Sequence, residues 1–152
     1  DKKEYKFFFV NIHPATDNVR LSFQCSTDGG SNYNTTMTTT WFRAYHYENN
    51  SGAGVSYVTS LDQAQGTAYQ VLDDIGADND QCTTGILHLF NPSSTTFVKH
   101  FTCRTQCVSS ADYSIDSHIA GYFNDTNDLT NISFKMSSGN IDDGKILMFG
   151  LD

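Results

Sequence analysis

The segment Tyr113–Leu151 decides the fold, and it reads YSIDSHIAGYFNDTNDLTNISFKMSSGNIDDGKILMFGL. It contains three stretches with the residue pattern of β-strands, joined by polar turns. In the middle run Ile132, Phe134 and Met136 alternate with polar residues, a period of two that is typical of a half-buried strand. The last run, Lys145–Leu151, is apolar on both faces, so we expect it to be covered from both sides or to close the domain against another sheet or subunit. Nothing in the segment is typical of catalysis, and its pattern favours the closing hairpin of a β-sandwich.

The remainder of the chain shows the same alternation of strands and turns. Clusters of Gly, Ser, Asn and Asp recur at a spacing of roughly eight to twelve residues, as in sandwiches and barrels. The runs between them are rich in aromatic and β-branched residues, which favour strands. With the two closing runs we expect about nine strands. The earlier ones are Tyr5–Ile12, Val19–Cys25, Thr35–Tyr47, Val55–Thr59, Gly85–Phe90, Thr96–Cys103 and Tyr113–Asn124.

One stretch departs from the strand pattern. Ser60–Ile75 lacks clean alternation, and Leu61–Gln65 has the composition of a short helix that Ser60 could cap. Gly66 follows so soon that any helix must be brief. The sequence therefore predicts a single all-β domain over residues 1–152, an antiparallel, jelly-roll-like β-sandwich with at most one short helix. In such a fold the N-terminal strand is expected beside the C-terminal strand.

The charge of the chain limits its partners. Lys and Arg number 9 against 17 Asp and Glu, which gives a formal net charge of −8. The basic residues are scattered, whereas nucleic-acid binding needs clustered Lys and Arg to replace the counterions of the phosphates. An anionic membrane surface requires similar clustering, and no apolar run has the length of a membrane-spanning helix. We therefore expect neither a nucleic-acid partner nor membrane insertion.

Catalytic motifs do not occur in the sequence. There is no Gly-x-Ser-x-Gly elbow and no glycine-rich phosphate loop. None of the 5 histidines lies two or four positions from another, so no metal or acid–base pair is indicated. No pair of carboxylates stands out as a glycosidase would require. We therefore do not expect an enzyme.

The 4 cysteines, Cys25, Cys82, Cys103 and Cys107, permit several states. An even count allows disulfides, and all four are candidates for them, although a domain of this size folds without them. A Cys103–Cys107 bridge would pin a tight loop. A structural zinc site normally needs a second close cysteine pair, which the sequence lacks. Disulfides or plain buried thiols are the alternatives that the sequence leaves open.

Two acidic turns could offer oxygen ligands to calcium, the one cofactor that we consider. In the turn Asp73–Asp80 the candidate ligands are Asp73, Asp78 and Asp80. The spacing does not follow the calcium loop of EF-hands, and the alternative is a solvated turn whose side chains hydrogen-bond their own backbone. The same two interpretations apply to Asn124–Asn131.

The strongest candidate for ligand binding is the threonine-rich strand and the loop after it. Tyr45 and Tyr47 share a face of this strand with Trp41, and exposed aromatic rings stack on sugars. Asn49 and Asn50 follow in the loop and could hydrogen-bond hydroxyl groups. The alternative is a central strand with both faces in the core, which we favour for Trp41. The loops Ser26–Asn34, Glu48–Gly54 and Asp73–Gln81 are candidates for exposed binding loops.

Several phrases of the sequence resemble a known module. They are FFFVNIHPATD at Phe7–Asp17, LFNPSSTTFVKHF at Leu89–Phe101, IAGYFN at Ile119–Asn124 and FKMSSGNIDDGKILMFGL at Phe134–Leu151. These phrases resemble a small β-sandwich module of structural proteins in tailed bacteriophages. The likeness extends over nearly the whole chain, and the closing phrase is its most specific part. The cysteines are a departure from the pattern of that module.

This resemblance implies a non-enzymatic virion component, either a tail-fibre module or a capsid-decoration protein. Its partners would be copies of itself, with a homotrimer favoured, and other virion proteins. The module has no catalytic residues to carry over. The apolar runs Lys6–Ile12 and Lys145–Leu151 agree with assembly, because they carry more apolar surface than one sheet face needs.

Two alternatives place the chain outside the cell. A secreted lectin-like module would bind cell-surface glycans through Tyr45, Tyr47 and a calcium-holding acidic loop. A filament-forming extracellular subunit would add its N-terminal strand to the sheet of the next protomer.

Overall fold

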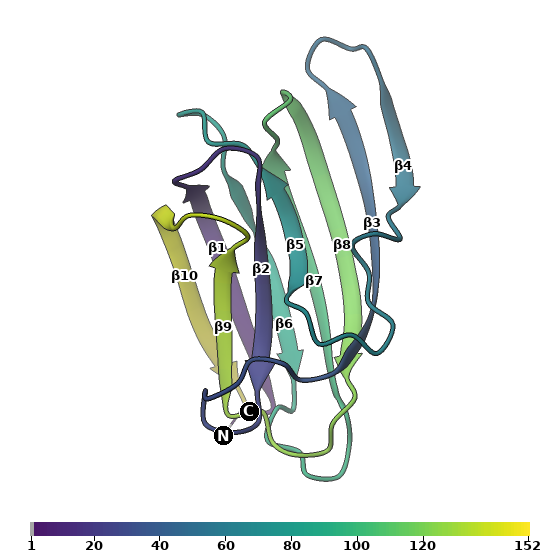
Figure 1. Cartoon of the computed structure of the whole chain (residues 1–152), viewed down its shortest axis with the longest axis vertical. Coiled ribbons are helices and arrows are strands. Elements are labelled where there is room, and N and C mark those ends of the chain that lie inside the picture. The colour runs from purple at the N-terminus through teal and green to yellow at the C-terminus, as the bar shows by residue number, and fades with distance from the viewer. Residues whose placement is uncertain (1) are drawn as a thin grey trace.

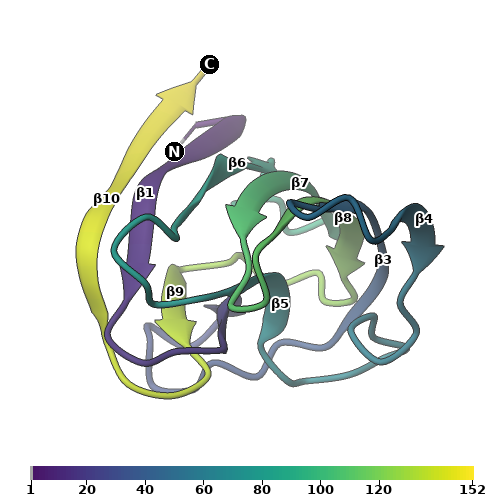
Figure 2. The ribbon, with the colours of Figure 1, turned by 90° about the horizontal axis from the view of Figure 1, so that it is seen from above.

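The computed structural model describes residues 2–152, which form two antiparallel β-sheets packed face to face (Figure 1). A seven-stranded sheet has the order β10-β1-β6-β7-β8-β3-β4, and a three-stranded sheet has the order β5-β2-β9. The large sheet curves around the small one (Figure 2). The strands are β1 (Glu4–Pro14), β2 (Val19–Ser26), β3 (Met37–Tyr47), β4 (Ala53–Tyr57), β5 (Gln70–Ile75), β6 (Thr83–Phe90), β7 (Lys99–Val108), β8 (Tyr113–Phe123), β9 (Asn131–Met136) and β10 (Ile141–Leu151).

The all-β sandwich predicted from the sequence is confirmed. The N-terminal strand β1 lies beside the C-terminal strand β10, with Phe8 opposite Leu147. The two ends of the described chain are also tied together, because the Lys3 amide donates to the Leu151 carbonyl at 2.9 Å. The helix-like stretch around Leu61, however, is a turn.

Strand β5 is the element that the sequence did not reveal. Its side chains Gln70 and Asp73 are polar yet fully buried, so the alternation of apolar and polar residues is lost. Both side chains are satisfied inside the sandwich: Gln70 accepts from the Thr39 hydroxyl at 2.7 Å, and Asp73 accepts from the Thr83 hydroxyl at 2.6 Å. Hydrogen bonding offsets the cost of burying such groups.

Aromatic rings fill the space between the sheets. Phe23 of β2 meets Phe101 of β7 edge to face, with ring centroids 5.0 Å apart, and also contacts Phe123 and Phe134. Trp41 is completely buried, and its indole N–H donates to the Val71 carbonyl at 3.1 Å. Trp41 therefore lies in the core as expected, whereas the other face of β3 does not, because Phe42 is 41% exposed.

The small sheet covers one face of the large sheet, here called the inner face. No strand of residues 2–152 covers the opposite, outer face (Figure 2). Strand pairing brings one outward side chain from each strand into a continuous row across the sheet. The row is Leu147, Phe8, Ile86, Arg104, His118, Phe42 and Tyr57.

Candidate functional site

Exposed apolar side chains gather at the β10 edge of the large sheet. On its outer face Leu147, Phe149 and Leu151 lie beside Phe8 and Val10 of β1, and we call these five residues the apolar edge. The rings of Phe8 and Phe149 meet edge to face at 5.5 Å. The exposed fractions along β10 are 43% for Leu147, 61% for Met148, 53% for Phe149 and 42% for Leu151.

Strand β10 pairs only with β1, so one side of its backbone is free to bond another strand. Natural sheets protect such edges with charges, prolines or bulges. Here a bulge and the acidic residues Asp142 and Asp143 protect only the start of the strand, where Gly144 adopts a φ of +101° over the Asn11 backbone. Ile146–Leu151 has no such protection. Because apolar edges of this kind bind other chains or aggregate, this part of β10 is the first candidate site.

A second candidate is the projecting β3–β4 hairpin, which carries the predicted binding residues. Tyr45 and Tyr47 lie on the inner face of β3 and pack with Tyr113 of β8, at ring distances of 6.1 and 4.7 Å. The structure therefore brings both tyrosines into one aromatic cluster that the sequence did not fully predict, since Tyr113 comes from a distant strand.

The two predicted asparagines do not line this cluster. Asn49 and Asn50 form the turn after β3: Asn49 accepts from the Ser51 amide at 2.9 Å, and Asn50 has a φ of +59°. The Asn50 side chain contacts His46 at 3.1 Å, and His46 lies on the outer face. Their side chains support the turn rather than the tyrosine cluster.

Besides Tyr113, sequence reasoning missed Arg43, which also belongs to this cluster. Its guanidinium carbon lies 5.7 Å from the centre of the Tyr45 ring and 5.9 Å from that of Tyr113. A charged residue on a strand is usually expected on the solvent side, but the alternation of β3 places Arg43 on the same face as the buried Trp41. That alternation was the one signal that could have found it.

The candidate calcium site at Asp73, Asp78 and Asp80 is not assembled. Asp73 points into the core from β5, whereas Asp78 and Asp80 lie in the exposed turn after that strand. The chain crosses from strand to turn within the acidic run, which separates the carboxylates. Residues 2–152 contain no group of three or more His, Cys, Asp or Glu side chains arranged to hold a metal ion.

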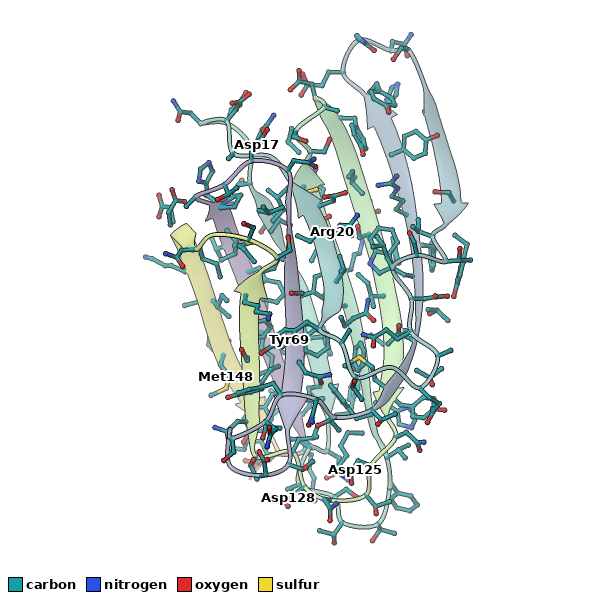
Figure 3. All side chains as sticks on the ribbon, in the orientation of Figure 1. Asp17, Arg20, Tyr69, Asp125, Asp128 and Met148 are labelled. Carbon is teal, nitrogen blue, oxygen red and sulfur yellow. The ribbon has the colours of Figure 1, made fainter. Side chains whose placement is uncertain are left out.

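The second acidic turn, within Asn124–Asn131, is organised by an ammonium group of the chain itself. Lys99 is buried, and its Nζ donates to the carbonyls of Asp125 and Asn127. Figure 3 shows Asp125 and Asp128 on this loop at the lower end of the sandwich. Burial lowers the pKa of Lys99, and the nearby carboxylates of Asp125 and Asp128 partly oppose that effect. The Lys99 ammonium thus binds two carbonyl oxygens of the turn for which calcium was one of the two interpretations.

The loop Ser26–Asn34 closes on itself. The Asp28 carboxylate accepts from the Ser26 hydroxyl at 2.6 Å and from the Asn32 side chain at 2.7 Å. These hydrogen bonds lower the pKa of Asp28 to about 2. Because the polar groups of the loop largely bind one another, it is a weaker candidate for recognition than the β3–β4 hairpin.

All four cysteines are free thiols in the structure, so the candidate disulfides of Cys25, Cys82, Cys103 and Cys107 are not formed. Cys103 and Cys107 both lie on β7, where an extended backbone separates them by roughly 13 Å, too far for a bridge. Cys25, Cys103 and Cys107 are buried thiols, which is the second of the two alternatives that the sequence left open. Burial raises the pKa of all three.

A shallow hollow of about 730 Å³ lies on the outer face. Arg104 binds Asp116 there with two hydrogen bonds of 2.9 Å, and these bonds lower the pKa of the Asp116 carboxyl. His118 contacts the same carboxylate at 3.3 Å and stacks on Phe42 with centroids 4.8 Å apart. The charged groups of the hollow are thus already paired with one another.

Comparison with protein-family models, with curated proteins and with solved structures finds no match for this chain. Residues 2–152 contain no helix and hence none that could span a membrane.

Proposed function

We propose that this chain is a non-enzymatic structural subunit of a virion and that it assembles with copies of itself through the apolar edge. One observation carries this proposal: β10, an edge strand with one unpaired side, exposes large apolar side chains on both of its faces. Val55, Tyr57 and Phe97 are also exposed, but among residues 2–152 β10 carries the longest run of exposed large apolar side chains, namely Leu147, Met148, Phe149 and Leu151. A contiguous apolar surface at a free sheet edge is typical of an interface.

The two faces of β10 favour a ring over a two-fold pair. Phe149 is exposed on the outer face, whereas its neighbour Met148 is exposed on the inner face. Figure 3 labels Met148. Beside Met148 a hollow of about 420 Å³ opens between the sheets, lined by Tyr5, Phe7 and Ile132 among others. An apolar side chain from the outer face of one subunit could enter the inner hollow of the next. A heterologous contact gives a ring where its rotation closes and an open filament where it does not, and a homotrimeric ring is the arrangement that we propose.

The charges near the apolar edge do not oppose association. On the outer face the neighbouring charged residues are Lys145, Lys6 and Glu4, and the last two lie 3.7 Å apart as an ion pair. The acidic remainder of the surface would instead keep assembled particles apart, over the short range that salt permits.

The virion setting is supported by the resemblance of the closing phrase Phe134–Leu151 to the bacteriophage module. In the fold this phrase forms the second half of β9 and all of β10, so the β10 residues of the apolar edge also belong to the resemblance. The extracellular filament alternative has less support, because β1 is already paired on both sides, with β10 and with β6. A calcium-dependent lectin has less support too, because the proposed ligands lie apart.

Lysines at the apolar edge should prevent assembly. We expect the double variant Leu147→Lys, Phe149→Lys to elute as a 16.9 kDa monomer under conditions in which the wild type is a trimer. Burial of each such side chain in the interface contributes about 1.5–3 kcal/mol to the free energy of association. A lysine in its place would remove this contribution and bury an unpaired charge. Light scattering after gel filtration measures the mass.

The matched control is the double variant Val55→Lys, Tyr57→Lys. Both residues are exposed on the outer face of β4, the opposite edge strand of the same sheet. We expect this variant to remain a trimer. If the β10 variant stayed assembled, or if the β4 variant dissociated equally, the apolar edge would not be the interface.

A further inference from the structure

Arg43 is the only arginine of residues 2–152 without a carboxylate partner. Arg104 binds Asp116 at 2.9 Å and Arg20 lies 3.8 Å from Asp74, but Arg43 forms neither an ion pair nor a side-chain hydrogen bond. Its Nε is buried without a hydrogen-bond partner, whereas its two terminal nitrogens reach solvent. Buried donors are nearly always paired, so an unpaired one calls for an explanation.

Within the large sheet, no carboxylate lies beside Arg43 on the inner face, and the Asp73 carboxylate of β5 instead accepts from its neighbour Ser117 at 3.2 Å. The cross-strand neighbours of Arg43 on the inner face are Ser56 and Ser117. Strand pairing places no Asp or Glu on the inner face of β3, β4 or β8, since Asp116 points outward with Arg104. Arg43 is therefore the one charged side chain that strand pairing places on the inner face of β3, β4 and β8, in a chain with a net charge of −8.

Aromatic rings frame the guanidinium. Tyr45 and Tyr113 both lie within cation–π distance of it, and Tyr47 packs on Tyr113. The Tyr45 ring lies so close to Gly54 that a Cβ atom on residue 54 would come within 3.2 Å of the Tyr45 hydroxyl. The Tyr47 ring lies over Gly52 in the same way, at an ordinary contact distance. The glycines of the hairpin thus provide flat backbone on which the tyrosine rings lie.

The cluster is accessible because the β3–β4 hairpin projects beyond the small sheet (Figure 1). Arg43, Tyr45, Tyr47 and Tyr113 are all half-buried, unlike Trp41 farther down the same face. We call these four residues the tyrosine–arginine cluster.

We propose that the tyrosine–arginine cluster binds a carboxylate-bearing saccharide, such as a uronic or sialic acid unit of a surface glycan. The outer end of the Arg43 guanidinium has the geometry to bind a carboxylate, because guanidinium groups bind carboxylates through two parallel hydrogen bonds. The tyrosine rings supply the apolar faces on which sugar rings stack. A neutral sugar would leave Arg43 unpaired, so the acid group determines specificity.

This site lies at the β4 edge of the large sheet, opposite the β10 edge where we propose assembly. A subunit held at one edge would present the cluster at the other. The inference does not depend on assembly, and the monomeric Leu147→Lys, Phe149→Lys variant should bind as the wild type does. Failure of one proposal can therefore be distinguished from failure of the other.

The test uses trigalacturonic acid and sialyllactose as acidic probes, with maltotriose and lactose as neutral counterparts. Calorimetry and saturation-transfer NMR with the full chain measure binding. We expect at least one acidic probe to bind at least tenfold more tightly than its neutral counterpart. Added salt should weaken that binding, and acetate at equal concentration should not displace the sugar.

The variant Arg43→Gln should weaken binding of the acidic probe at least tenfold, and Arg43→Lys should weaken it less. Arg104→Gln, an arginine of the outer face, is the control and should bind normally. Circular dichroism checks that each variant is folded. Lack of binding by both acids, equal binding of the neutral sugars, displacement by acetate, or unchanged binding by folded Arg43→Gln would each overturn the proposal.

Discussion

Replacing Lys99 by methionine is expected to lower the free energy of unfolding by about 3 kcal/mol, because the buried ammonium holds a loop together. Lys99 is fully buried on β7, and its Nζ donates to the carbonyls of Asp125 and Asn127. Methionine keeps most of the volume of the aliphatic stem but donates no hydrogen bond. The carbonyls then lose a charged donor at the end of the sandwich. Urea-induced unfolding followed by tryptophan fluorescence measures the change, since Trp41 is the single tryptophan.

Lys135→Met is the matched control for this variant. Lys135 is an exposed lysine on β9 whose ammonium lies 4.0 Å from the centre of the Tyr69 ring. We expect this substitution to change the free energy of unfolding by about 1 kcal/mol or less. Similar losses in both variants would show that Lys99 does not organise the loop.

The second large effect concerns pH, and it arises from Asp73. Burial raises the pKa of this carboxyl to about 6, although hydrogen bonds from Thr83 and Cys107 act in the opposite direction. The folded state thus binds the proton more tightly than the unfolded state, whose pKa is near 3.8. This contribution is therefore fully present below about pH 4 and is lost as the pH rises to about 6. A difference of about two pH units corresponds to about 3 kcal/mol.

Asp73→Asn should remove this contribution to the pH dependence, since the amide stays neutral at every pH. Between pH 4 and pH 7 we expect the wild type to lose stability relative to Asp73→Asn by about 3 kcal/mol. Comparing the two proteins cancels the titration of all other groups. Asp74→Asn, at a partly exposed residue 3.8 Å from Arg20, is the control. Parallel profiles of wild type and Asp73→Asn would show that Asp73 does not titrate in this range.

The two-residue period of the sequence was sufficient to predict most of the fold. It placed Trp41 in the core and Tyr45 and Tyr47 on the same face of their strand, because one face of β3 packs against the small sheet around Trp41. It failed for β5, whose buried Gln70 and Asp73 are polar. Side-chain hydrogen bonds, which depend on contacts between distant strands, make that burial possible.

The candidate sites were less predictable, because they depend on where one sheet stops covering the other. The apolar run Lys145–Leu151 allowed either a covered strand or a contact with another subunit, and the sheet order leaves β10 at an edge with its apolar residues exposed. Arg43 becomes a candidate only when Tyr113 is placed beside it by the pairing of β3 with β8. No local pattern contains that pairing.

The measurement that tests the proposed assembly most directly is the native mass of the wild-type chain, with negative-stain imaging, in the presence and absence of a chelator. We expect a particle of about three times 16.9 kDa with three-fold symmetry, unchanged by the chelator. A 16.9 kDa monomer at every concentration would contradict assembly through the apolar edge.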